Sequence, residues 1–237
     1  MTGVETSATL VKVGVAVISR AAPTGLEIVK AWLKGKEVII VGQARAGKTT
    51  FVDYLQFGLF EDEKDTSKTR DVEESARFNI KMGRDSALQL SVKKVVDVPG
   101  QIGAAWQADE VFYRRPHAIV IMTDLTSPLD GEPDRAAAAW LLEFCRELES
   151  NWRIKGKRGN RVKSIILVMN KLDKVTEDVV TSRKTKFQGI LNTELREARG
   201  RMLSEIAIMP CSLVTNPQGT KAVDAVIAHL AKTLARK

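Results

Sequence analysis

The order of apolar and polar positions alternates between strand-like and helix-like segments from residue 37 onward. Short apolar runs typical of buried strands lie at residues 37–41, 76–82, 88–97, 117–124, 163–169 and 204–211. Segments with apolar residues on one helical face lie at about residues 48–57, 134–151, 183–199 and 219–236. Because strands mostly alternate with helices, the pattern predicts an α/β fold: a largely parallel sheet with helices on both faces.

Two strand-like runs break this alternation. Residues 76–82 and 88–97 are joined by the short segment GRDSA, which indicates a β-hairpin. We therefore expect a six-stranded, mostly parallel sheet with one antiparallel edge strand. The polar segments 58–75 and 98–116 show no strong periodicity, so we expect mobile loops there.

Residues 1–35 precede the first clear strand and are expected to form an N-terminal extension. Thr24 and Glu27 make a capping box ahead of an apolar helical face, so this extension is predicted to be at least partly helical. The earlier run at residues 10–18 fits a strand and a helix. Residues 36–237 are expected to form one domain.

Composition and charge indicate a globular protein with an acidic ligand or partner. The chain is 44% apolar and 28% charged, which is ordinary for a globular protein, and its net charge of +8 favours an acidic ligand or partner. Cys145 and Cys211 lie far apart without metal-type spacing, so we expect a reduced, cytoplasmic setting. The basic connector at residues 153–163 is expected to be a solvated loop, with an anion-contacting surface as the alternative.

The segment GQARAGKTT, residues 42–50, follows an apolar strand and opens a helix. Its spacing is that of a phosphate loop, in which glycines let backbone N–H groups converge on phosphate oxygens. Lys48 is expected to reach the terminal phosphates, and the Thr49 hydroxyl to bind Mg²⁺. An ordinary glycine-capped turn would leave Lys48 without a role. The expected nucleotide-binding residues of this segment are Gly42, Ala44, Arg45, Ala46, Gly47, Lys48, Thr49 and Thr50.

A second polar group follows a strand in the sequence VVDVPGQ. Asp97 ends this strand, and a strand parallel to the phosphate-loop strand would point its carboxylate at the Mg²⁺ site. Gly100 can present its N–H to a terminal phosphate, and Gln101 has the donor and acceptor needed to align an attacking water. The alternative is a plain Pro-Gly turn.

The third strand-end signal bears on the base of the nucleotide. Asn170, Lys171 and Asp173 follow the strand IILVM. The two oxygens of Asp173 match the adjacent N1–H and amino donors of guanine, which adenine lacks in that arrangement. Asn170 can tie this loop to the phosphate loop, and the stem of Lys171 can cover the base. Ser212 and the Leu213 N–H are expected to complete the pocket.

These four ordered motifs resemble those of small GTPases of the Ras-like and Arf-like kind, over roughly residues 37–236. The resemblance implies the P-loop GTPase fold, binding of GTP or GDP with Mg²⁺, and slow hydrolysis with Lys48 and Gln101 as catalytic residues. It implies a molecular switch that partner proteins read through the loops 58–75 and 98–116. It also implies a switch threonine; Thr69 is preferred over Thr66, and the implied Mg²⁺ ligands are Thr49, Thr69 and Asp97.

Several residues depart from this family pattern or admit two interpretations. Ala44 stands where many Ras-like proteins have glycine, Pro99 precedes the switch glycine, and Leu213 replaces a small residue. Trp106 is a candidate partner anchor, with a packed aromatic side chain as the alternative. Four arginines are candidate arginine fingers or ordinary surface arginines: Arg45, Arg70, Arg114 and Arg115. His117 and His229 are expected to be structural.

Two other functions stay open at this point. One is a GTP-binding scaffold with little turnover, and the other is a ribosome- or RNA-associated GTPase, although no RNA-binding module is recognisable. Residues 8–35 are a candidate for peripheral contact with the inner membrane surface, but no lipidation signal of the family supports anchoring.

Overall fold

The computed structural model describes residues 36–57, 73–75, 78–81, 89–92, 94–100, 102–132, 135–154, 161–196, 205–214 and 217–235. The helices and strands are, in chain order, β1 (Glu37–Gly42), α3 (Lys48–Phe57), β2 (Glu73–Ser75), β3 (Phe78–Lys81), β4 (Gln89–Val92), β5 (Lys94–Asp97), α4 (Ala104–Arg114), β6 (Ala118–Asp124), α5 (Ala137–Ile154), β7 (Ser164–Asn170), a 3-10 turn η1 (Leu172–Lys174), α6 (Glu177–Glu194), β8 (Glu205–Pro210) and α8 (Pro217–Ala235).

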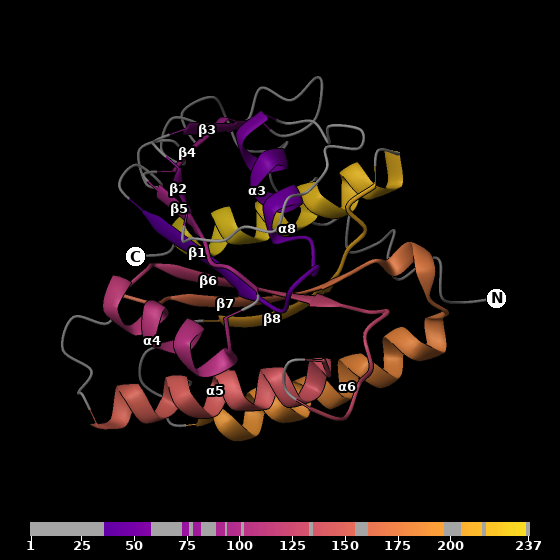
Figure 1. The fold of residues 1–237 in the computed structure, drawn as a ribbon. Coiled ribbons are helices and arrows are strands. Elements are labelled where there is room, and N and C mark those ends of the chain that lie inside the picture. Colours follow the sequence, from indigo (N-terminus) through magenta and orange to yellow (C-terminus); the bar gives the residue numbers. More distant parts are fainter. Residues whose placement is uncertain are drawn as a thin grey trace.

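Five strands run parallel in the order β5-β1-β6-β7-β8 (Figure 1). β2 pairs antiparallel with β5, and β3 pairs antiparallel with β4 as a separate two-stranded sheet. In the register, Ile40 of β1 lies beside Asp97 of β5 and Val120 of β6. The prediction of an α/β fold with a parallel sheet is therefore confirmed.

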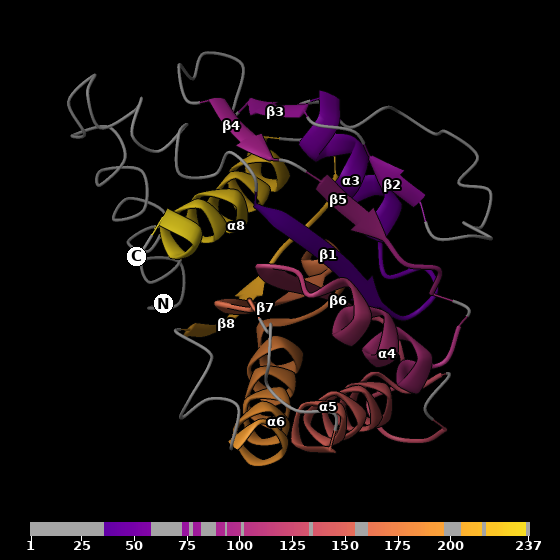
Figure 2. The same cartoon turned by 90° about the vertical axis from the view of Figure 1, so that its left-hand side faces the viewer.

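The sheet separates two hydrophobic cores (Figures 1 and 2). Helices α4, α5 and α6 cover one face, and α3 and α8 cover the other. Successive side chains of a strand point to opposite faces, so Ile39 and Val41 join the first core while Val38 and Ile40 join the second. All four are essentially inaccessible, and burying a side chain of this kind stabilises the fold by about 1.5–3 kcal/mol. Both faces of β1 are thus fixed in place.

The predicted loop at residues 98–116 is wrong, because most of it forms helix α4. The buried face of this helix consists of Ala104, Gln107, Ala108 and Val111. These residues recur at helical spacing, so the sequence carries the helical period that the prediction of a loop missed. The helix ends at Arg115, which adopts the left-handed conformation.

Two further boundaries differ from the prediction. The strand expected at residues 88–97 is divided into β4 and β5. Helix α6 begins at Glu177 rather than near residue 183, with Glu177 and Asp178 in its first turn. Only Phe187, Ile190 and Leu191 of α6 are buried, so the apolar pattern marks the second half of the helix alone.

The parallel strands end at one edge of the sheet, and each of four brings a distinctive residue there. These strand ends are Gly42, Asp97, Asp124 and Asn170. Cys145 and Cys211 are buried free thiols. Across the described ranges, no helix combines the length and the apolar character needed to cross a membrane.

Candidate functional site

The loop between β1 and α3, residues 42–49, curls through three left-handed or glycine-type conformations. Gly42, Arg45 and Gly47 have φ values of 144°, 62° and 92°. A Cβ atom at Gly42 would collide with the backbone oxygen of Met122 on β6, so no other residue fits there. The strained backbone turns the loop around the N-terminus of α3, the arrangement in which N–H groups can surround an anion.

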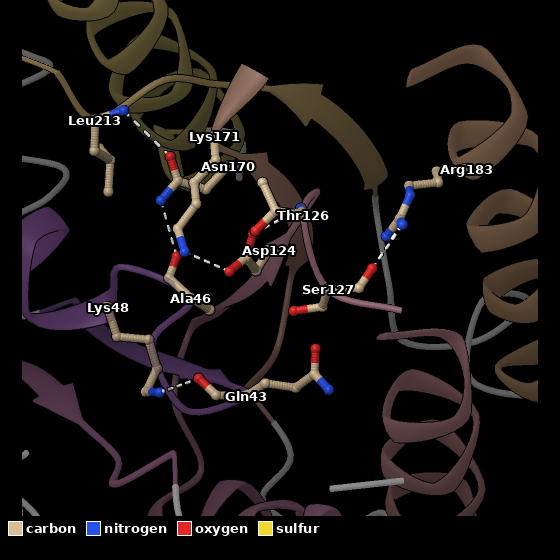
Figure 3. A network of polar contacts seen from close by, with 10 residues as sticks. All are labelled: Gln43, Ala46, Lys48, Asp124, Thr126, Ser127, Asn170, Lys171, Arg183 and Leu213. Atoms are coloured by element: carbon tan, nitrogen blue, oxygen red, sulfur yellow. Dashed lines mark hydrogen bonds and ion pairs between the residues drawn. The ribbon is translucent and has the colours of Figure 1, made fainter. Parts of the chain in front are cut away.

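Lys48 lies inside this loop, with only 6% of its surface exposed. Its ammonium donates to the backbone oxygens of Gly42 (3.0 Å) and Gln43 (2.8 Å), as Figure 3 shows for the second bond. Burial lowers the pKa of Lys48 to about 8, although the charge of Asp97 opposes this shift. A phosphate at this position would add negative charge beside the buried ammonium, which in the described residues is balanced by Asp97.

Thr49 and Asp97 come together from α3 and β5. The Thr49 hydroxyl donates to Oδ2 of Asp97 at 2.9 Å, and Asp97 is 3% exposed. Within the described ranges, no group of three or more His, Cys, Asp and Glu side chains could hold a metal ion. One hydroxyl and one carboxylate do fit Mg²⁺, because this ion usually keeps waters and phosphate oxygens as its other ligands.

Gly100 lies directly against the phosphate loop. A Cβ atom there would overlap the Lys48 ammonium and would sit 2.5 Å from the Ala44 nitrogen. The backbone of residue 100 is therefore in contact with two of the groups expected to hold phosphate. Only glycine allows such an approach.

The Asn170 side chain joins the end of β7 to the phosphate loop (Figure 3). Its Nδ2 donates to the Ala46 oxygen at 2.9 Å, and its Oδ1 accepts from the Leu213 N–H at 3.2 Å. Asn170 is 3% exposed, and a Cβ at Gly47 would collide with its amide. Three loops that are far apart in sequence are thus held in register by one amide.

Lys171 adopts the left-handed conformation, with φ of 66°, and its ammonium forms an ion pair with Asp124 at the end of β6. Asp124 also accepts from the Thr126 N–H at 2.7 Å and from its hydroxyl at 2.6 Å. Burial raises the pKa of Asp124, but the bonds from Lys171 and Thr126 outweigh it, so the pKa lies below its usual value. Asp124 stays ionised and holds Lys171 beside the loop.

Asp173 accepts a short hydrogen bond from the Ser212 hydroxyl. The residue as a whole is exposed, so its carboxylate is accessible to a ligand. Leu213 follows Ser212, and its side chain reaches Gly47, where a Cβ atom would be 2.9 Å from Cδ1. Asp173, Ser212 and Leu213 therefore lie close together next to the phosphate loop.

The other predicted residues divide into those described and those outside the described ranges. Ala44 and Arg45 are exposed at the tip of the phosphate loop, and Thr50 lies in the first turn of α3. Arg114 pairs with Glu110 at 2.5 Å. The predicted residues outside the described ranges are Thr66, Thr69, Arg70 and Gln101.

Sequence reasoning missed two residues of the site. Asp124 ends a wholly buried strand, as Asn170 does, and that position was a usable signal. Gln107 on α4 accepts from the Gly42 N–H at 2.9 Å. The only sequence signal for Gln107 is its spacing from Ala104, Ala108 and Val111, which places an amide on the buried face.

Comparison with known proteins supports the fold. No family model and no curated protein matches the chain. The solved mammalian SRP receptor matches with a TM-score of 0.54 at 18% identity, over 82% of this chain and 100% of that chain. The bacterial selenocysteine-specific elongation factor EF-Sec matches with a TM-score of 0.52 at 19% identity, over 84% of this chain. The chain spans only 28% of the length of EF-Sec.

A third solved structure is the elongation factor SelB from Methanococcus maripaludis, in complex with the GTP analogue GppNHp. It matches with a TM-score of 0.49 at 17% identity, over 81% of this chain and 32% of that chain. The first two likenesses support the fold of P-loop GTPases for this chain, and at these identities they show the fold alone.

Proposed function

We propose that the chain binds GTP and GDP and works as a slow GTP-hydrolysing switch. One observation carries this proposal: Asn170, which precedes the expected base-binding residues, is hydrogen-bonded to Ala46 of the phosphate loop. A base and a phosphate chain that belong to one nucleotide need two subsites at a fixed separation. The Asn170 amide provides that fixed connection.

The phosphate end rests on the phosphate loop and Lys48. The buried ammonium and the N–H groups of the loop would bind the phosphate oxygens. Thr49 and Asp97 would hold Mg²⁺, which when bound neutralises charge on the phosphates. The resident residues thus bind and orient the phosphate chain.

The base end accounts for the preference for guanine. Asp173 offers two carboxylate oxygens, and the Ser212 hydroxyl donates to one of them and so orients the group. Adenine would leave the carboxylate facing a ring nitrogen without a hydrogen, which is costly in a partly dry pocket. Lys171, held by Asp124, would cover the base with its aliphatic stem.

Hydrolysis and switching rest on residues 58–75 and 98–102. Gln101 would orient the attacking water, and Thr69 would join Thr49 and Asp97 at the Mg²⁺ ion; both remain predictions from the sequence. Gly100 supports the switch role, because its backbone already contacts Lys48 and Ala44. A terminal phosphate would press on Gly100 and move its loop.

The partner surface is proposed to include the outer face of α4. Trp106 is 40% exposed and Tyr113 is 66% exposed, and they lie two helical turns apart on the same side. Exposed aromatic side chains are common anchors in protein interfaces. We take residues 36–237 as the nucleotide-binding domain and residues 1–35 as an extension that contacts the core, a partner or a membrane surface.

Nucleotide identity tests the proposal. The purified protein should contain GDP or GTP, and GTP should displace a fluorescent GDP analogue far better than ATP does. Asp173→Asn should weaken GTP and strengthen xanthosine triphosphate, because an amide can donate to the C2 oxygen that replaces the amino group of guanine. Equal competition by ATP, unchanged in Asp173→Asn, would refute the base assignment.

Turnover separates the switch enzyme from a GTP-binding scaffold. Phosphate release should be slow in the wild type and further reduced in Gln101→Leu, while both proteins keep their affinity for GDP. A protein that binds GTP and releases no phosphate, alone or with partners, would be a scaffold.

A further inference from the structure

The buried face of α4 carries an amide that the proposed function does not yet use. Gln107 has no exposed surface and lies among Ala104, Ala108 and Val111. A buried amide needs hydrogen-bond partners, because leaving one unpaired costs about 1–3 kcal/mol. The positions of those partners therefore indicate what Gln107 holds.

Gln107 joins the start of the phosphate loop to the loop that follows β5. Its Oε1 accepts from the Gly42 N–H at 2.9 Å, and its Nε2 donates to the Ile102 oxygen at 2.7 Å. Longer contacts run from Nε2 to the oxygens of Gly42 (3.3 Å) and Pro99 (3.4 Å). The amide therefore has partners on both sides of Gly100: Pro99 before it and Ile102 after it.

The loop that Gln107 holds is pressed against the phosphate-binding groups. A Cβ at Gly100 would overlap the Lys48 ammonium and approach within 2.6 Å of the Ala44 Cα. A space too small for one methyl group cannot admit a phosphate oxygen between Gly100 and these groups. A terminal phosphate can therefore lie between Gly100 and these groups only when Gly100 withdraws.

We propose that Gln107 is a positioning residue that, through Pro99 and Ile102, holds Gly100 on the phosphate loop and so favours a nucleoside diphosphate over a triphosphate. This inference rests on the proposed function. The bond to the Gly42 N–H keeps the amide in place, while the contacts with the Pro99 and Ile102 oxygens give way as Gly100 withdraws. The loss of those contacts lowers the binding free energy of the triphosphate but not that of the diphosphate.

The ratio of two dissociation constants tests this role. Gln107→Met keeps the length of the side chain but removes its hydrogen bonds. We expect the affinity for a non-hydrolysable GTP analogue to rise about threefold to tenfold relative to that for GDP. The loss of the bond to Gly42 affects both nucleotides equally and cancels in the ratio. An unchanged ratio would overturn the proposal.

Asn151→Ala is the matched control. Asn151 is a buried residue on α5 whose side-chain amide donates to Asp109 on α4 at 2.9 Å. Removing this amide therefore also weakens the packing of α4 against α5. We expect the affinity ratio to stay at the wild-type value in this variant. A shift as large as that of Gln107→Met would mean that any loosening of α4 has the effect, and the specific role of Gln107 would be wrong.

Hydrogen exchange in the nucleotide-free protein gives a second readout. The Ile102 N–H is bonded to the Pro99 oxygen at 3.3 Å. Its exchange should be faster in Gln107→Met than in the wild type and in Asn151→Ala. If Gln107→Met does not fold, Gln107→Glu keeps an acceptor for the Gly42 N–H and should show the same faster exchange, because its carboxylate repels the two carbonyl oxygens.

The affinity measurement and the hydrogen-exchange measurement test the proposed function and the role of Gln107 separately. A protein that binds neither nucleotide refutes the proposed function, whereas exchange at Ile102 still shows whether Gln107 holds the loop. Unchanged exchange at Ile102 overturns the anchoring role even where GTP and GDP bind as proposed.

Discussion

Removing the Asn170 amide tests whether the base and phosphate subsites depend on one connection. Asn170→Ala deletes the bond to the Ala46 oxygen (2.9 Å) and the bond from the Leu213 N–H (3.2 Å). The Ala46 residue is fully buried, so its oxygen cannot easily find water in exchange. Both the stability of the fold and the alignment of the subsites should suffer.

The size of the effect follows from these two bonds. A net contribution of about 0.5–1.5 kcal/mol per bond, plus the cost of a buried unpaired oxygen, gives a loss of about 2–4 kcal/mol. Part of this loss appears as a lower free energy of unfolding, because the loops are joined even without nucleotide. We expect about 2 kcal/mol there and about a tenfold weaker binding of GDP.

Urea unfolding measures the change in the free energy of unfolding, and titration with a fluorescent GDP analogue measures the change in affinity for GDP. Asn151→Ala provides the comparison, because it removes a buried amide bond between α5 and α4 and leaves both bonds of Asn170 in place. It should lower stability by about 1 kcal/mol and leave the affinity for GDP unchanged. Equal effects of the two variants on GDP affinity would refute the view that Asn170 aligns the subsites.

Three further predictions concern Lys48, Thr49 and Asp124. In the presence of EDTA, the affinity for GDP should fall about tenfold between about pH 7 and about pH 9, because the pKa of Lys48 is lowered and its ammonium, which phosphate binding favours, loses its proton over this range. Isothermal titration calorimetry should show no such decline in Lys48→Met. Thr49→Val should remove most of the gain in GDP affinity caused by Mg²⁺, with the affinity in EDTA unchanged, because only the bond network with Asp97 and the ion is lost. Asp124→Asn should speed GDP dissociation several-fold in stopped flow, since Lys171 loses its ion pair, and a wild-type rate would argue against this support of the base loop.

The fold and the clustering of several candidate residues could be predicted because the signals are local. Lys48 and Thr49 follow a buried strand across a short loop, and Asp97 and Asn170 end strands of a parallel sheet, whose carboxyl ends meet at one edge. Asp124 has the same position at the end of β6. It escaped notice because its role is to hold Lys171, which depends on a contact between two strand ends rather than on a sequence motif.

Helix α4 and Gln107 show where such reasoning stops. The buried residues of α4 lie at helical spacing, but three of the four are alanine or glutamine, which one by one do not mark a buried face. An amide on such a helix is expected on the solvent side. Only the closeness of Gly42, Pro99 and Ile102 in space explains why this one is buried.

The two buried amides together determine which part of the site can respond to a nucleotide. Gln107 is bonded to Gly42 at the start of the phosphate loop, and Asn170 is bonded to Ala46 near its end. Between them, Lys48 draws the oxygens of Gly42 and Gln43 inward. A loop held at three points keeps its shape whether or not phosphate is present. On the proposed function, the segment around Gly100 takes up part of the difference between a diphosphate and a triphosphate. The contacts of Gln107 with the Pro99 and Ile102 oxygens then add to the free energy that this movement costs.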